Sequence, residues 1–190
     1  MGYIKRETKE TKIEITSNIY GSGKSKIETK IGFFDHMLES FAKHSWMDLD
    51  ISCDGDTFVD YHHSVEDVGI ALGLAIAQDV YPVQNIERFG NSSIPMDETL
   101  VECSIDISNR PFLFLNVEVD GKVGEFDSEL LEEFLRAFVY NLKISCHINL
   151  VRGKNRHHII EATFKALAVA LRRALVQNQK AGIPSTKGVL

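Results

Sequence analysis

The chain has 190 residues, of which 44% are hydrophobic, and it carries a formal net charge of −6. This length suits one domain or two small repeats with a substantial core, and the acidic balance without any basic run argues against nucleic-acid binding. No apolar run approaches the roughly 18 residues of a membrane span, and the polar start lacks the apolar region of a signal peptide. We therefore expect a cytoplasmic protein with no nucleic-acid or membrane partner.

The first half of the chain alternates between strand and helix patterns. Apolar residues at every second position predict strands, and apolar residues at three- and four-residue spacing predict helices. The predicted elements are strands at 11–19 and 26–31, a helix at 36–45, strands at 48–53 and 56–60, and a helix at 62–80. Asp35 is the expected N-cap of the first helix, and Pro82 ends this half.

The second half repeats the same order of elements. We predict strands at 99–107 and 112–119, a helix at 128–142, a strand at 144–150 and a helix from 157 to about 178. This repetition indicates an internal duplication of a unit of roughly 90 residues. We therefore predict two pseudo-symmetric repeats, residues 1–90 and 91–190, within one compact enzyme domain.

The three cysteines, Cys53, Cys103 and Cys146, are widely spaced and form no C-x-x-C pair. Cysteines in such an arrangement are most often reduced and buried. We therefore predict free thiols, and neither disulfides nor zinc ligands.

One motif occurs twice, at the start of each long predicted helix. It is His62-His63-Ser64-Val65-Glu66 in the first half and His157-His158-Ile159-Ile160-Glu161 in the second. On a helix, residues i and i+4 share a face, whereas residue i+1 points about 100° away. Each motif therefore offers a histidine–glutamate pair to one metal ion and a single imidazole to another.

Three further histidines lie outside the motifs. His147 alternates with apolar neighbours in its strand and ordinarily would be a histidine on a polar sheet face, but it lies ten residues before the second motif, so we predict a metal ligand. We likewise predict that His36 is a metal ligand. His44 could support a ligand, contact substrate or only end its helix. The predicted sets are His62, Glu66, His158 and His147 on one ion, and His157, Glu161, His63 and His36 on the other.

A second group of residues suits an anion. Arg88 and Arg110 are each flanked by turn residues, and the segment Ser185-Thr186-Lys187 supplies two hydroxyls and a cation. Taken singly, such residues are usually a solvated arginine and a solvated tail. Together they form a set that can bind phosphate.

These patterns together resemble the imidazoleglycerol-phosphate dehydratase family. The similar stretches are residues 8–11, 32–38, 60–69, 106–111, 155–162 and 184–188. The resemblance implies an α+β fold with an internal duplication, similar to domain 2 of ribosomal protein S5, with two helices on one face of each four-stranded sheet. It also implies a homo-oligomer of 24 subunits built from trimers, with two Mn²⁺ ions per active site at subunit contacts.

The resemblance further implies a lyase of histidine biosynthesis that converts D-erythro-imidazole glycerol phosphate to imidazole acetol phosphate and water. Two cations on opposite sides of the substrate ring would stabilise an imidazolate, which then expels hydroxide through a diazafulvene-like intermediate. Glu10 is the leading acid/base candidate outside the ligand set. The implied catalytic residues are Glu10, His62, His63, Glu66, His157, His158 and Glu161. The implied substrate contacts are Glu10, His36, His44, Arg88, Arg110, Lys165, Ser185, Thr186 and Lys187.

Two other classes of protein also fit the motifs. A dinuclear metallohydrolase would use two metal ions to activate water on a phosphate ester. A metal-storage or scaffold protein would use the ligands but would have no use for the anion-binding residues. The ligand set suits Mn²⁺, Fe²⁺, Ni²⁺ or Zn²⁺, and affinity order alone does not select manganese.

Overall fold

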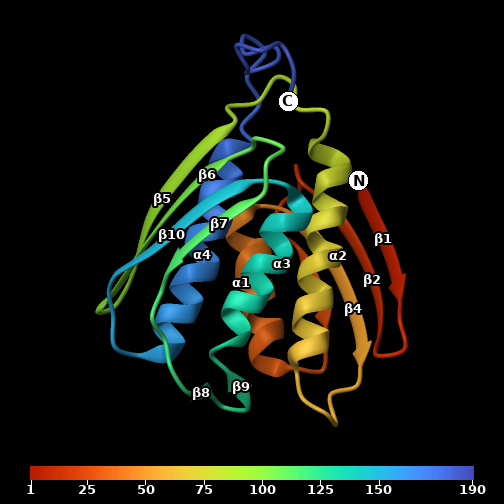
Figure 1. Cartoon of the computed structure of the whole chain (residues 1–190), viewed down its shortest axis with the longest axis vertical. Coiled ribbons are helices and arrows are strands. Elements are labelled where there is room, and N and C mark those ends of the chain that lie inside the picture. The colour runs from red at the N-terminus through yellow and green to blue at the C-terminus, as the bar shows by residue number, and fades with distance from the viewer.

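Two four-stranded sheets with the same topology form the two outer layers of the structure (Figure 1). This computed structural model describes residues 1–190. The first sheet has the order β1-β2-β4-β3 and the second β5-β6-β10-β7, and in each only the last pair of strands is parallel. The strands are β1 (Gly2–Glu7), β2 (Thr11–Asn18), β3 (Ser25–Glu28), β4 (Asp48–Gly55), β5 (Phe89–Met96), β6 (Thr99–Asp106), β7 (Phe112–Asn116) and β10 (Ser145–Arg152). Their matching order confirms the predicted internal duplication.

Four helices fill the space between the sheets, so each sheet is covered on one face, as predicted (Figure 1). They are α1 (Gly32–Ser45), α2 (His62–Val80), α3 (Leu130–Leu142) and α4 (Arg156–Ala174). Helix α2 packs on β1 and β2, α4 packs on β5 and β6, and the two helical layers meet as α2 against α3 and α1 against α4. A two-stranded ribbon of β8 (Lys122–Val123) and β9 (Phe126–Asp127) precedes α3. No helix combines the length and apolar character that a membrane crossing requires.

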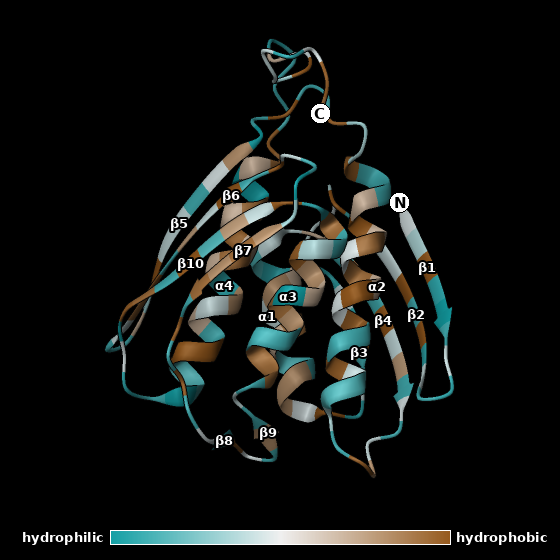
Figure 2. Cartoon of the chain, viewed as in Figure 1, coloured by the Kyte–Doolittle hydropathy of each residue, from teal (hydrophilic) through white to brown (hydrophobic).

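Alternation of side chains explains the inner strands. Ile13 and Ile15 on β2 face the helices and are buried, while the intervening residues are exposed, and hydropathy alternates accordingly along the strand (Figure 2). The helices bury their predicted apolar stripes, including Leu72 of α2 and Leu167 of α4. One continuous core therefore joins both repeats.

Helices α2 and α3 approach each other closely at two glycines of α2. A Cβ atom on Gly69 would lie 2.9 Å from the carbonyl oxygen of Phe134, and one on Gly73 would lie 2.7 Å from that of Phe138. Because neither glycine has a Cβ atom, the backbone of α2 can pack closely against α3 at both positions. The spacing of four residues places both glycines on one face of α2.

The structure differs from the predicted elements in several places. The predictions lack the edge strands β1 and β5, because β1 is largely polar and β5 spans the predicted boundary between the repeats at residues 90 and 91. Residues 56–60 form a loop rather than a strand. Helix α1 begins at Gly32, so Asp35 lies in its first turn and accepts hydrogen bonds from the backbone N–H and hydroxyl of Thr29. Helix α4 ends at Ala174, four residues earlier than expected.

Candidate active site

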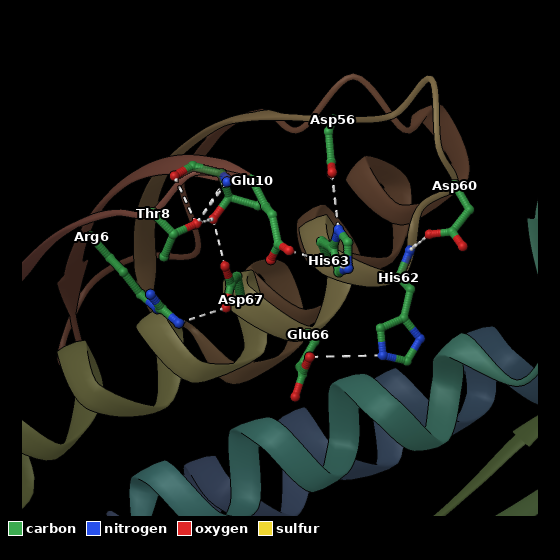
Figure 3. A network of polar contacts seen from close by, with 10 residues as sticks. Arg6, Thr8, Glu10, Asp56, Asp60, His62, His63, Glu66 and Asp67 are labelled. Carbon is green, nitrogen blue, oxygen red and sulfur yellow. Dashed lines mark hydrogen bonds and ion pairs between the residues drawn. The ribbon is translucent and has the colours of Figure 1, made fainter.

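The first motif begins helix α2 and presents its side chains in two directions (Figure 3). The backbone N–H of His62 donates to Asp60 over 2.8 Å, and its Nε2 lies 3.7 Å from Oε2 of Glu66. The ring of His63 is turned by 89° from that of His62. This is the arrangement expected for residues at i, i+4 and i+1 of a helix, with one histidine–glutamate pair and one separate imidazole.

The second motif begins helix α4 in the same way. The side chain of Asn155 caps the helix and accepts hydrogen bonds from the backbone N–H groups of His157 and His158. His157 Nε2 lies 3.0 Å from Oε2 of Glu161, and the rings of His157 and His158 are inclined by 79°. His36, from α1, places its Nε2 3.6 Å from the same glutamate oxygen. The possible ligand atoms of His36, His157 and Glu161 all lie within 4.8 Å of one another.

A lysine stabilises the charge of Glu161. Lys165, one turn further along α4, places its Nζ 2.6 Å from Oε1 of Glu161. Burial disfavours the carboxylate, but the hydrogen bond and charge of Lys165, with the bond from His157, outweigh burial and lower the pKa of Glu161. The carboxylate is therefore ionised, as a metal ligand must be.

Two carboxylates hold the separate imidazoles, one in each repeat. Nδ1 of His63 lies 3.1 Å from Oδ2 of Asp56, and Nδ1 of His158 lies 2.8 Å from Oε2 of Glu98. The bond to Asp56 raises the pKa of His63. The pKa of Glu98 is lowered mainly by three hydrogen bonds. The largest effect comes from the backbone N–H of Asn155, followed by the side chain of His158 and the backbone N–H of Lys154.

Sequence patterns did not identify Asp56 and Glu98, because only the folded chain places them beside the histidines. A signal for Glu98 does exist. Glu98-Thr99 precedes β6 as Glu10-Thr11 precedes β2, so the two glutamates occupy the same place in the two repeats.

Glu10 lies in the hairpin between β1 and β2, with its carboxylate 3.9 Å from Nε2 of His63 (Figure 3). The hydroxyl of Thr8 accepts hydrogen bonds from the backbone N–H groups of Glu10 and Thr11. The hydroxyl of Thr11 in turn donates to the buried Asp67 of α2 over 2.5 Å. The hairpin is thus fixed to the start of α2, which places Glu10 beside the first motif.

His147 and His44 lie apart from this arrangement within one chain. His147 is exposed on β10, with its ring 5.7 and 5.5 Å from those of Phe112 and Phe114, on the face opposite the buried Cys146. His44, at the end of α1, has a lowered pKa because of burial and the nearby charges of Lys165 and Arg172. A single chain therefore brings together His36, His157 and Glu161, three of the four predicted ligands of the second ion. Within that chain, His63 is separate from the His157–Glu161 pair, and His158 and His147 are separate from the His62–Glu66 pair.

The predicted anion-binding residues line one cavity of about 820 Å³. They are Arg88, Arg110, Ser185, Thr186 and Lys187. Arg88 is already occupied, because it donates to Asp106 over 2.7 Å and to the carbonyl oxygen of Pro184 over 2.6 Å. Arg88 therefore holds the C-terminal segment in place, while the largely exposed Arg110 and Lys187 remain available to an anion.

The starts of α2 and α4, which carry the histidine motifs, and the C-terminal segment, which lines the anion cavity, lie at opposite ends of the molecule (Figure 1). The backbone N–H of Arg88 donates to the carbonyl of Ala174 at the C-terminal end of α4, whereas His157 is at its N-terminal end. The two positions are separated by 17 residues of helix, or about 26 Å. The small phosphorylated imidazole that the resemblance implies as substrate cannot reach both ends of the same chain.

A family model described as imidazoleglycerol-phosphate dehydratase matches residues 29–171. The chain belongs to the imidazoleglycerol-phosphate dehydratase family. An imidazoleglycerol-phosphate dehydratase of Nitratiruptor sp. is 64% identical over 187 residues, 98% of each chain. The crystal structure of the Staphylococcus aureus imidazoleglycerol-phosphate dehydratase matches with a TM-score of 0.83 at 41% identity, covering 93% of this chain and 99% of that one. The Pyrococcus furiosus structure matches with a TM-score of 0.85 at 39% identity, covering 98% and 100%.

Membership of the imidazoleglycerol-phosphate dehydratase family assigns the chain to the hydro-lyases of histidine biosynthesis, as the resemblance implied. The similar structures also confirm the α+β fold with its two sheets and four helices. A hydrolase of phosphate esters is not favoured, because the relatives that match over nearly the whole chain are dehydratases.

Proposed function

We propose that the chain dehydrates D-erythro-imidazole glycerol phosphate to imidazole acetol phosphate in active sites assembled from different copies of the chain. The observation that supports this proposal is the separation of about 26 Å between the histidine motifs and the anion cavity along α4. Both ends carry residues suited to one substrate, an imidazole and its phosphate. Only contact between copies can bring the two ends together.

The donor set suits a divalent transition ion. His36, His157 and Glu161 already converge, and imidazole with carboxylate is a ligand combination suited to Mn²⁺. We propose two Mn²⁺ ions per site, one held by His62, Glu66, His158 and His147 and the other by His157, Glu161, His63 and His36. When bound, the ions would polarise the substrate imidazole and stabilise negative charge on it. Because single chains separate these sets, the missing imidazoles would come from neighbouring copies.

The remaining residues bind substrate and move a proton. Arg110 and Lys187 would bind the phosphate with the hydroxyls of Ser185 and Thr186, while Arg88 holds their segment through the carbonyl of Pro184. His44 and Lys165 complete the proposed substrate contacts, beside His36. Glu10, fixed through Thr8 and Thr11 to α2, would exchange a proton at its carboxylate with the reacting substrate carbon or leaving hydroxyl.

We also propose a homo-oligomer of 24 subunits built from trimers, working in the cytoplasm. Contacts between copies that complete a metal site would link metal binding to assembly, since each ion adds free energy only to the assembled state. The three cysteines are all free and buried, which fits a reducing compartment.

One experiment with metal removal tests both the reaction and the assembly. We expect the enzyme with Mn²⁺ to convert imidazole glycerol phosphate, and the chelated enzyme to be inactive and much smaller by light scattering, with recovery of both properties when Mn²⁺ is returned. Full turnover after complete metal removal would contradict the metal proposal. An unchanged particle size would contradict the proposal that metal links the copies.

A further inference from the structure

We propose that Glu98 and Asp56 are positioning residues that fix the two separate imidazoles, His158 and His63, with their Nε2 atoms available to metal. This inference rests on the ligand sets of the proposed function. Each carboxylate contacts Nδ1 of its histidine, over 2.8 Å for Glu98 and 3.1 Å for Asp56. A ring that donates its Nδ1–H to a carboxylate keeps its lone pair on Nε2, which is the tautomer that binds a metal ion through Nε2.

Neither Nε2 atom is taken by another group of the chain. Nε2 of His63 is 3.9 Å from Glu10 and Nε2 of His158 is 3.7 Å from Asp97, both beyond hydrogen-bond distance. The Nδ1 atom of each imidazole is thus held by a carboxylate, while its Nε2 atom is free. A histidine that ligates a metal ion in the site of a neighbouring copy needs such a free Nε2.

Glu98 also fixes the backbone that carries His158. Its Oε1 accepts hydrogen bonds from the backbone N–H groups of Lys154, over 3.1 Å, and Asn155, over 2.8 Å. Asn155 is the N-cap of α4 and holds the N–H groups of His157 and His158. One carboxylate therefore sets both the direction of the His158 ring and the place where its helix begins.

The two repeats achieve this with different residues. In the second repeat, the glutamate before the inner strand, Glu98, holds the imidazole. In the first repeat the equivalent residue is Glu10, but Asp56, from the loop between β4 and α2, holds His63 instead. The carboxylate of Glu10 consequently makes no hydrogen bond and stays on the Nε2 side of His63. The duplication thus supplied two equivalent glutamates, of which one positions a ligand and the other remains free for proton transfer.

The test compares how tightly variants retain Mn²⁺. The Mn²⁺-loaded oligomer is titrated with a chelator, and release is followed by the electron paramagnetic resonance signal of free Mn²⁺. Glu98→Gln and Asp56→Asn should each lower the affinity of one of the two classes of ion by about 10- to 100-fold. Glu102→Gln, an exposed glutamate on the same strand as Thr99, should retain Mn²⁺ as the parent does.

Three comparisons decide the result. At saturating Mn²⁺ both positioning variants should regain most of the kcat of the parent, because the histidine ligand itself remains. If the carboxylates were needed only for the folded structure, added Mn²⁺ would not restore kcat. Glu10→Gln should retain Mn²⁺ but lose turnover. His158→Ala should release one class of ion. If it does so, but Glu98→Gln and Asp56→Asn bind both classes of ion as tightly as the parent, this inference is wrong. If His158→Ala also retains both ions, the ligand sets of the proposed function are wrong instead.

Discussion

At the scale of single residues, identical motif positions have different surroundings in the two repeats. Glu161 has 9% of its side chain exposed and pairs with Lys165, whereas Glu66 is 44% exposed and the residue one turn later is Ile70. A lysine thus supports the carboxylate in one motif only. The two proposed metal sites therefore differ in charge although their ligands match.

The placement of the motif side chains could be predicted from sequence, because helix geometry fixes which of them share a face. Asp56 and Glu98 could not be predicted in that way. Their positions depend on how a loop and a hairpin fold onto the helix start, and acidic residues in turns are common.

Asp48 provides a prediction about pH. Its Oδ1 accepts hydrogen bonds from the backbone N–H groups of Ser22 and Lys24, which lower the pKa of Asp48 below its usual value of 3.8. Because the folded pKa is depressed, the stabilisation is complete above the unfolded pKa and is lost as pH falls through the folded one. Asp48→Ala should reduce the free energy of unfolding at pH 7 by about 1 kcal/mol, a value discounted for exposure.

Urea unfolding of the parent and Asp48→Ala between pH 3 and 8 measures this difference. The gap should be constant above pH 5 and should narrow below about pH 4. Asp50→Asn, at an exposed position of the same strand, serves as the control. A gap that stays constant down to pH 3 would show that the charge of Asp48 does not matter.

At the scale of elements, the inner strands, the edge strands β3 and β7 and the long helices could be predicted, whereas the edge strands β1 and β5 could not. Strands β2, β4, β6 and β10 each pair on both sides. Burial alternates along β2, β4 and β6 and along the first half of β10, and α2 begins and ends where its apolar pattern does. The edge strand β1 pairs only with β2 and shows little burial, so its sequence resembles a polar loop. Residues 56–60 form a loop rather than the predicted strand, and this loop brings Asp56 to the site.

The contact between α2 and α3 provides a prediction about packing. Alanine ordinarily favours a helix over glycine by about 1 kcal/mol. At Gly69 or Gly73, however, the new methyl group would meet a carbonyl oxygen of α3 at 2.9 or 2.7 Å. Overpacking of this kind costs about 1–3 kcal/mol, so Gly69→Ala and Gly73→Ala should lower the thermal unfolding midpoint of the chelated protein. Gly32→Ala is the matched control, because no atom lies within 4 Å of its Cβ, and it should not lower the midpoint.

At the scale of the whole molecule, the four helices act as a spacer between two functional ends (Figure 1). One end presents the starts of α2 and α4, and the other presents Arg110 and the C-terminal segment. The sequence identified the candidate residues at each end but not the distance between the two groups, because that distance follows from the orientation of α4 in the folded chain.

Mixing two defective variants tests whether the ends of different copies form one site. His157→Ala removes a proposed ligand and Lys187→Ala removes a proposed phosphate contact. After chelation, mixing in equal amounts and return of Mn²⁺, about a quarter of the sites should combine intact ends from different copies and regain activity at low substrate concentration. Oligomers assembled separately and mixed afterwards should stay defective. If joint assembly restores no activity, the proposal that one active site combines the ends of different copies is wrong.

The spacing of the two ends also bears on how sequences of this family vary over time. If His158 and Lys187 meet the same substrate from different copies, substitutions at one end can be compensated at the other, since a single gene encodes both. Such pairs would covary although α4 separates their regions by most of its length. A map of covarying positions would then contain pairs of residues that are too far apart to be in contact within one chain. Those pairs would identify the surfaces through which the copies contact each other.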